Sequence, residues 1–69
     1  MNKESILRRA GMAKVLMEIS IELGTIHPRC FEDLQLRRKS LDFYVLNGEL
    51  TKADLEIDSI YKLLTDCLE

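Results

Sequence analysis

The two cysteines, Cys30 and Cys67, are the side chains best suited to chemistry in this sequence of 69 residues. Cys30 falls at the start of one expected helix and Cys67 at the end of the next, so antiparallel packing would bring the thiols together. A disulfide then requires Cα atoms within about 7 Å. His27 and Asp66 could complete a metal site, but the sequence lacks the Cys-x-x-Cys pairs typical of zinc sites. We expect two buried free thiols, with a disulfide as the second interpretation and a metal site as the third.

No other group of residues points to catalysis. His27 is the only histidine and stands in a break before a helix, where capping the backbone is the expected role. No serine lies in a Gly-x-Ser-x-Gly elbow, and the three glycines are isolated rather than gathered in a phosphate-binding loop. The pair Glu32 and Asp33 suits a helix start, where carboxylates complement the helix dipole. We therefore predict no enzyme activity, no catalytic residue, no cofactor and no metal.

The densest basic run is Arg37, Arg38 and Lys39, in a chain whose net charge is only −2. A dimeric DNA-binding regulator that uses basic residues of the first two helices is the alternative function. Against it, the helix after the Asn47–Gly48 turn would be the recognition helix of a helix-turn-helix, and residues 51–69 carry five acidic and two basic residues. We expect the run to be a solvated face, with Arg37 or Arg38 pairing with acids of the third helix.

Apolar residues recur at intervals of three and four in three segments, which predicts an all-α fold and a single domain over residues 1–69. The expected helices span residues 3–23, 28–46 and 51–68. Their similar lengths and short connections favour a small antiparallel bundle or helical hairpin. The three buried rows are predicted to be Ile6, Ala10, Ala13, Met17 and Ser20; Phe31, Leu34, Arg38, Leu41 and Val45; and Ala53, Ile57, Ile60, Leu64 and Cys67.

Local signals mark the helix ends. Asn2 is placed to cap the first helix and Gly24 to end it, while Pro28 can only begin the second. Asn47–Gly48 ends the second helix. For the third, Thr51 with Asp54 predicts a capping box, and Leu50 with Leu55 predicts a hydrophobic staple across the first turn.

The segment Asn47–Leu55, followed by Lys62–Leu64, resembles the short helical-hairpin motif of SHOCT-type segments. Those segments contain a helix, a Gly-x-hydrophobic-Ser/Thr turn, an acidic residue and a closing Leu-Leu. The Lys-rich middle of that motif is replaced here by Asp58–Ile60. The resemblance covers about 18 of the 69 residues and implies a helical hairpin, with no function carried over.

The first helix has more apolar residues than one buried row needs. A second line of four follows at spacings of 4, 3 and 4, leaving a polar wedge formed by Arg8, Lys14, Glu18 and Glu22. A small chain is poor in core, so we predict that this line is the interface of a two-fold homodimer. Its residues are Met12, Leu16, Ile19 and Leu23. The alternative is that the first helix lies in the groove between the other two.

The second helix also has apolar residues opposite its expected core row. Leu36 and Phe43 flank basic residues on what should be the solvent side. We predict that this surface binds a larger protein, for example a transcription regulator or other host factor, and modulates or inhibits it through helix-face packing. The predicted contact residues are Leu36, Arg37, Lys39, Phe43 and Tyr44.

The start of the chain, Met-Asn-Lys-Glu-Ser, lacks the apolar core of a secretory signal. No apolar run approaches the ~20 residues needed to cross a bilayer. Together with the expected free thiols, these observations predict a soluble cytoplasmic protein that does not bind membranes.

Overall fold

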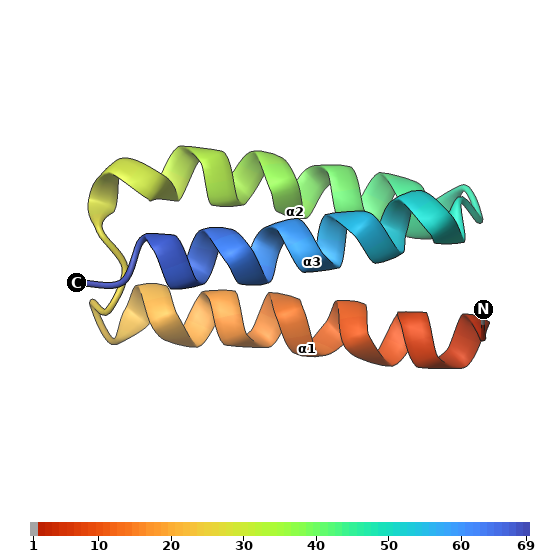
Figure 1. The fold of residues 1–69 in the computed structure, drawn as a ribbon, viewed down its shortest axis with the longest axis horizontal. Helices are drawn as coiled ribbons and strands as arrows, with labels where there is room; N and C mark the ends of the chain where they lie inside the picture. Colours follow the sequence, from red (N-terminus) through yellow and green to blue (C-terminus); the bar gives the residue numbers. More distant parts are fainter. Residues whose placement is uncertain (1) are drawn as a thin grey trace.

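Three helices make up the fold, as the sequence predicts. The computed structural model describes residues 2–69, with α1 (Lys3–Glu22), η1 (Pro28–Cys30), a short 3-10 helix, α2 (Phe31–Leu46) and α3 (Leu50–Asp66) in that order. In Figure 1, α1 and α3 run in the same direction and α2 runs in the opposite direction, so the bundle is up-down-up. Of the helices among residues 2–69, none combines the length and apolar character that a membrane crossing requires.

The predicted cap of α1 and the glycine ends of α1 and α2 are confirmed, but α2 begins at Phe31 rather than at Pro28, which instead begins η1. The Asn2 side chain accepts hydrogen bonds from the backbone N–H groups of Glu4 and Ser5, at 2.9 and 3.3 Å. Gly24 and Gly48 both have φ of +70°, the left-handed conformation that ends a helix. After α1, the Gly24 N–H donates to Ile21 O. These local bonds satisfy backbone groups that a helix end leaves without partners.

The start of α3 differs from the expected capping box. The helix begins at Leu50, one residue before the predicted N-cap Thr51, and Glu49 precedes it without a side-chain capping bond. Asp54 instead forms an ion pair with Arg9 of α1. Leu55 is exposed, so the predicted staple with Leu50 does not form. The capping pattern is wrong here because a contact between helices has engaged the acidic residue.

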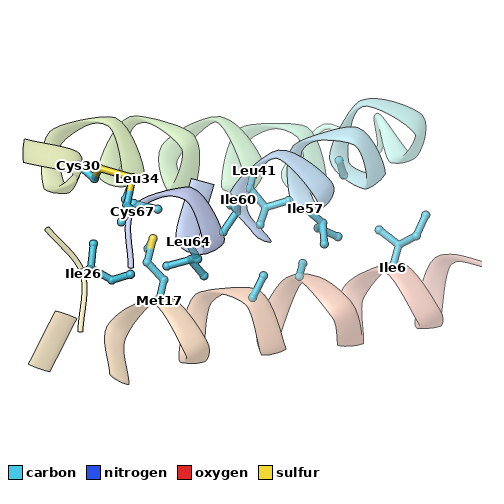
Figure 2. Packing of buried hydrophobic residues seen from close by; sticks show 13 residues of the cluster. Ile6, Met17, Ile26, Cys30, Leu34, Leu41, Ile57, Ile60, Leu64 and Cys67 are labelled. Carbon is cyan, nitrogen blue, oxygen red and sulfur yellow. A yellow bond between two sulfur atoms is a disulfide. The ribbon is translucent and has the colours of Figure 1, made fainter. Parts of the chain in front are cut away.

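The core consists of most residues of the predicted rows, packed along the length of the bundle, together with Ile26 and Cys30, which were in none of those rows (Figure 2). The buried row residues are Ile6, Ala10, Ala13 and Met17 of α1; Leu34 and Leu41 of α2; Ala53, Ile57, Ile60 and Leu64 of α3; and Cys67 directly after α3. The alanines allow α1 and α3 to approach closely. Ser20, Phe31, Arg38 and Val45 are only half-buried, at the margins of the rows.

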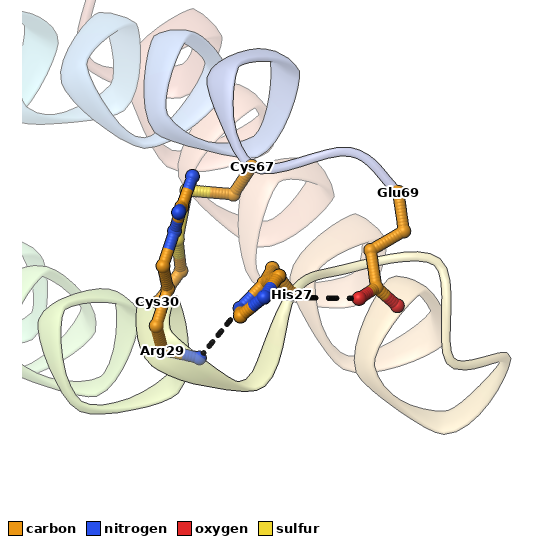
Figure 3. Close-up of a disulfide and its surroundings, with 5 residues drawn as sticks. All are labelled: His27, Arg29, Cys30, Cys67 and Glu69. Atoms are coloured by element: carbon orange, nitrogen blue, oxygen red, sulfur yellow. Dashed lines mark hydrogen bonds and ion pairs between the residues drawn. A yellow bond between two sulfur atoms is a disulfide. The ribbon is translucent and has the colours of Figure 1, made fainter.

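A disulfide joins Cys30 to Cys67, so the leading expectation of two free thiols is wrong. The geometric argument holds: the start of α2 and the end of α3 meet, with Cα atoms 6.4 Å apart (Figure 3). The same end carries a short backbone pairing, in which the His27 N–H donates to Cys67 O at 2.9 Å. Ile26 lies beneath this pairing and is fully buried. The disulfide therefore closes the end of the bundle where the interhelical loop crosses the C-terminus.

Removing the disulfide should destabilise the bundle. It closes a loop with a sequence separation of 37, so reduction should lower the free energy of unfolding by about 3–4 kcal/mol, because the unfolded chain regains conformational freedom. Urea denaturation with and without dithiothreitol measures this effect. The Cys30→Ala/Cys67→Ala variant is the control and should not respond to the reductant. An unchanged midpoint for the reduced wild type, with both thiols titrated as free, would contradict the prediction.

Candidate protein-binding surface

The outer face of α1 is an exposed apolar surface. All four residues predicted for the dimer interface lie on it: Met12, Leu16, Ile19 and Leu23 are between 44% and 72% exposed. The alternative, in which α1 is wrapped by the other two helices, is wrong for this face, because only the row containing Ala13 and Met17 is buried. We define the outer α1 face as Leu7, Gly11, Met12, Val15, Leu16, Ile19 and Leu23.

Leu7, Gly11 and Val15 belong to this face but were not among the predicted interface residues. Their spacing of four residues follows the face along the helix, so the signal was present in the sequence. Together with Arg8, Met12, Leu16 and Ile19 they line a shallow hollow of about 490 Å³. The side chains of the outer α1 face thus surround one shallow hollow and form a continuous surface.

Gly11 lies in this hollow. A Cβ built on Gly11 meets no atom within 4 Å, so nothing in the chain itself requires glycine there. Glycine inside a helix costs about 1 kcal/mol relative to alanine. The residue therefore leaves open space at a small cost in helix stability, and that space faces outward.

Ion pairs tie the flanks of α1 to its neighbours. On the α3 side, Arg9 pairs with Asp54 and Asp58, and the hydrogen bond that its guanidinium donates to Asp54 raises the pKa of Arg9 above its usual value. On the α2 side, Lys14 pairs with Asp42 at 2.8 Å.

Glu18 also pairs on the α2 side, with Arg38. Two members of the predicted polar wedge, Lys14 and Glu18, therefore bind α2 rather than facing solvent alone. The other two, Arg8 and Glu22, have no ion pair within the described residues. Glu4, one turn before Arg8, also has no ion pair among these residues, so Glu4 and Arg8 near one end of the outer α1 face and Glu22 near the other are charges that the chain leaves unpaired.

The apolar surface continues toward the C-terminus of the chain. A second, smaller hollow lies between α1 and the end of α3, where Leu16 and Ser20 meet Leu64, Thr65 and Leu68. Leu68 is exposed. Leu16 borders both hollows, so a partner seated on α1 would also reach the end of α3.

The partner-binding residues predicted on α2 differ in exposure, although the rings of Phe43 and Tyr44 meet edge to face with their centroids 6.0 Å apart. Leu36 and Phe43 are each more than half exposed, and Lys39 is also exposed. Tyr44, by contrast, packs against the core, with the Lys52 ammonium 5.9 Å from its ring centroid. Arg37 turns toward α3. The exposed part of the predicted site is therefore Leu36, Lys39 and Phe43.

The basic run of α2 is largely paired. Arg37 pairs with Glu56 of α3 at 3.4 Å, as expected, and the Glu56 side chain is mostly buried. Arg38 pairs with Glu18 of α1 rather than with an acid of α3. The run is thus divided between both neighbours of α2, and this leaves Lys39 without an ion pair within residues 2–69.

His27 caps the turn before α2, as the sequence indicates. Its Nδ1 accepts a hydrogen bond from the Arg29 N–H at 3.1 Å, and its Nε2 lies 4.0 Å from a Glu69 carboxylate oxygen (Figure 3). In the described part of the chain, no three His, Cys, Asp or Glu side chains are grouped so that they could hold a metal ion. The geometry around His27 is that of a helix start.

Gly11→Ala should raise the free energy of unfolding by about 0.5–1 kcal/mol, because alanine favours the helix and its methyl group meets open space. Urea denaturation at low micromolar concentration measures the effect. Gly24→Ala is the matched control and should destabilise the protein by about 1 kcal/mol, because φ there is +70°. A destabilising Gly11→Ala would show that the hollow is already filled.

Comparison with known proteins adds no relative of this chain. A scan against protein-family models, a search of curated proteins and a search of solved structures each found no match.

Proposed function

We propose that this chain is a non-enzymatic interaction protein that binds other polypeptides through exposed helix faces, chiefly the outer α1 face. The observation that carries the proposal is the continuous exposed apolar surface from Leu7 to Leu23, hollowed at Gly11. Burial of such a surface against another helix is favourable by about 25 cal/mol per Å² of apolar area. A helix that is apolar on both its inner and outer faces is typical of one covered by a further chain.

The charge arrangement supports protein binding over DNA binding. Four basic side chains of the first two helices, Arg9, Lys14, Arg37 and Arg38, are engaged by carboxylates of neighbouring helices. A DNA-binding face needs such groups available for phosphates. No observation on α1 or α2 favours the DNA-binding alternative.

The exposed residues of α2 offer a second, smaller surface. Leu36 and Phe43 stand away from the core beside Lys39. Aromatic and aliphatic anchors with a nearby charge are typical of protein interfaces. We assign to this surface the contact with a larger protein whose activity the chain would modulate.

The disulfide indicates the redox state of the compartment in which the protein acts. Disulfides between buried cysteines persist in oxidising compartments and are rare in the reducing cytosol. Cys30 and Cys67 are both buried and joined. This supports an oxidising site of action over the cytoplasmic location that the sequence predicts.

A photo-crosslinking amino acid at Met12 should form adducts with polypeptides in the native host, because Met12 lies in the outer α1 face. The same probe at Lys62, an exposed polar position on α3, is the control and should form few adducts. Ile19→Glu should abolish the adducts of the Met12 probe by placing a charge in the apolar surface. Equal yields from both probe positions, unaffected by Ile19→Glu, would overturn the proposal.

A further inference from the structure

We propose that the polypeptide seated on the outer α1 face is a second copy of this chain, with the two α1 helices antiparallel about a two-fold axis at Val15. This inference rests on the proposed function and names the partner. In the pair, Ile19 of each copy packs over Gly11 of the other, and Arg8 of each copy lies beside Glu22 of the other.

The residues along the middle of this face are arranged symmetrically. Arg8, Gly11, Val15, Ile19 and Glu22 follow one another at spacings of 3, 4, 4 and 3, which keeps them on one side of a helix. We call these five residues the seam. In an antiparallel two-fold pair, residues equally distant from the centre share a layer of the interface. With Val15 at the centre, Gly11 shares a layer with Ile19, and Arg8 shares one with Glu22.

Side-chain size matches in the inner layers. Gly11 lies in the hollow, and a Cβ there would meet nothing in its own chain. Ile19 is 46% exposed and lines the other end of the same hollow. A large side chain of one helix enters the space left by a small one in the facing helix. Gly11 lowers the stability of a single copy, but in the pair it leaves the space that Ile19 of the other copy occupies.

The charges at the ends of the seam favour an antiparallel over a parallel arrangement of the two α1 helices. The charges on the flanks of α1 are satisfied within the chain, by Asp54, Asp42 and Arg38. Arg8 and Glu22, at the ends of the seam, are not. Antiparallel pairing brings each of these free charges beside its opposite, whereas parallel pairing would set Arg8 against Arg8 and Glu22 against Glu22. Antiparallel helix dipoles add to this preference.

The size of the contact indicates a reversible dimer. The seam spans four helical turns, roughly 21 Å at 1.5 Å per residue. Flanking side chains such as Met12 and Leu16 widen it toward α3. Such an interface lies near the lower limit for specific complexes, about 1,200 Å² in total. We expect a dissociation constant in the micromolar range.

Sedimentation equilibrium of the full chain with its disulfide intact, from about 1 to 300 µM, tests the proposal. The wild type should show a reversible monomer–dimer equilibrium. Arg8→Glu and Glu22→Arg should each weaken dimerisation about tenfold, because two opposite-charge contacts become like-charge contacts. The double variant Arg8→Glu/Glu22→Arg should recover the wild-type affinity. A monomer throughout, or a double variant no tighter than the single ones, would overturn the antiparallel pair.

Two further variants test the centre and the hollow. Val15→Cys copies should form an intermolecular disulfide under mild oxidation, because the two-fold axis brings equal positions together; Lys62→Cys is the control and should not. Gly11→Leu should weaken dimerisation at least tenfold while leaving the monomer folded, since the added side chain fills the space for Ile19. Failure of Val15→Cys to cross-link, or a Gly11→Leu dimer as tight as wild type, would contradict the geometry.

The outcomes separate this inference from the proposed function. A chain that stays monomeric while its Met12 probe still cross-links to a different protein removes the second copy as the partner and keeps the proposed function. A monomeric chain whose Met12 probe gives no more adducts than Lys62 removes both.

Discussion

The structure depends on three narrow apolar rows that bury one another, with the row of α3 packed against both α1 and α2. Ile57 and Ile60 are fully buried, and Ala53 and Leu64 extend their row toward both ends of the helix. The rows on α1 and α2 face this helix, so the fold is determined by which side of each helix is buried. Because a chain of 69 residues buries only about 60% of its unfolded surface, such a core is marginal. The interhelical ion pairs and the disulfide both act at the edges of this core.

The disulfide compensates for weakness at one end of the bundle. There the loop through Ile26 crosses the chain end, and only two backbone hydrogen bonds join the two segments, from His27 to Cys67 and from Glu69 to Thr25. Short irregular segments contribute little packing and unfold locally at low cost. A covalent link between Cys30 and Cys67 keeps this end closed and places Leu64 and Leu68 beside α1. The surface at the C-terminal end of α1 therefore depends on a link far from it in the sequence.

Local patterns predicted the elements of this fold, and contacts between elements decided the rest. The helical rows, the Asn2 cap and the glycine ends at Gly24 and Gly48 follow from spacing and backbone conformation, which the sequence contains directly. The start of α3 was missed because Arg9, 45 residues away from Asp54, engages the acid of the expected capping box. The partner of Arg38 and the joining of the cysteines likewise depend on which helices become neighbours.

The candidate site was predicted in part for the same reason. The second apolar line of α1, from Met12 to Leu23, is exposed. The number of apolar residues in this helix and their spacing already predicted such a line. The width of the face was not predictable, because Leu7, Gly11 and Val15 become part of it only once α2 and α3 cover the other sides of α1. Those two helices also take up Arg9, Lys14 and Glu18, so they determine which charges remain free. The packing that completes the monomer thus leaves an apolar seam that ends in Arg8 and Glu22, and a seam with opposite charges at its two ends is complementary to its own reversed copy.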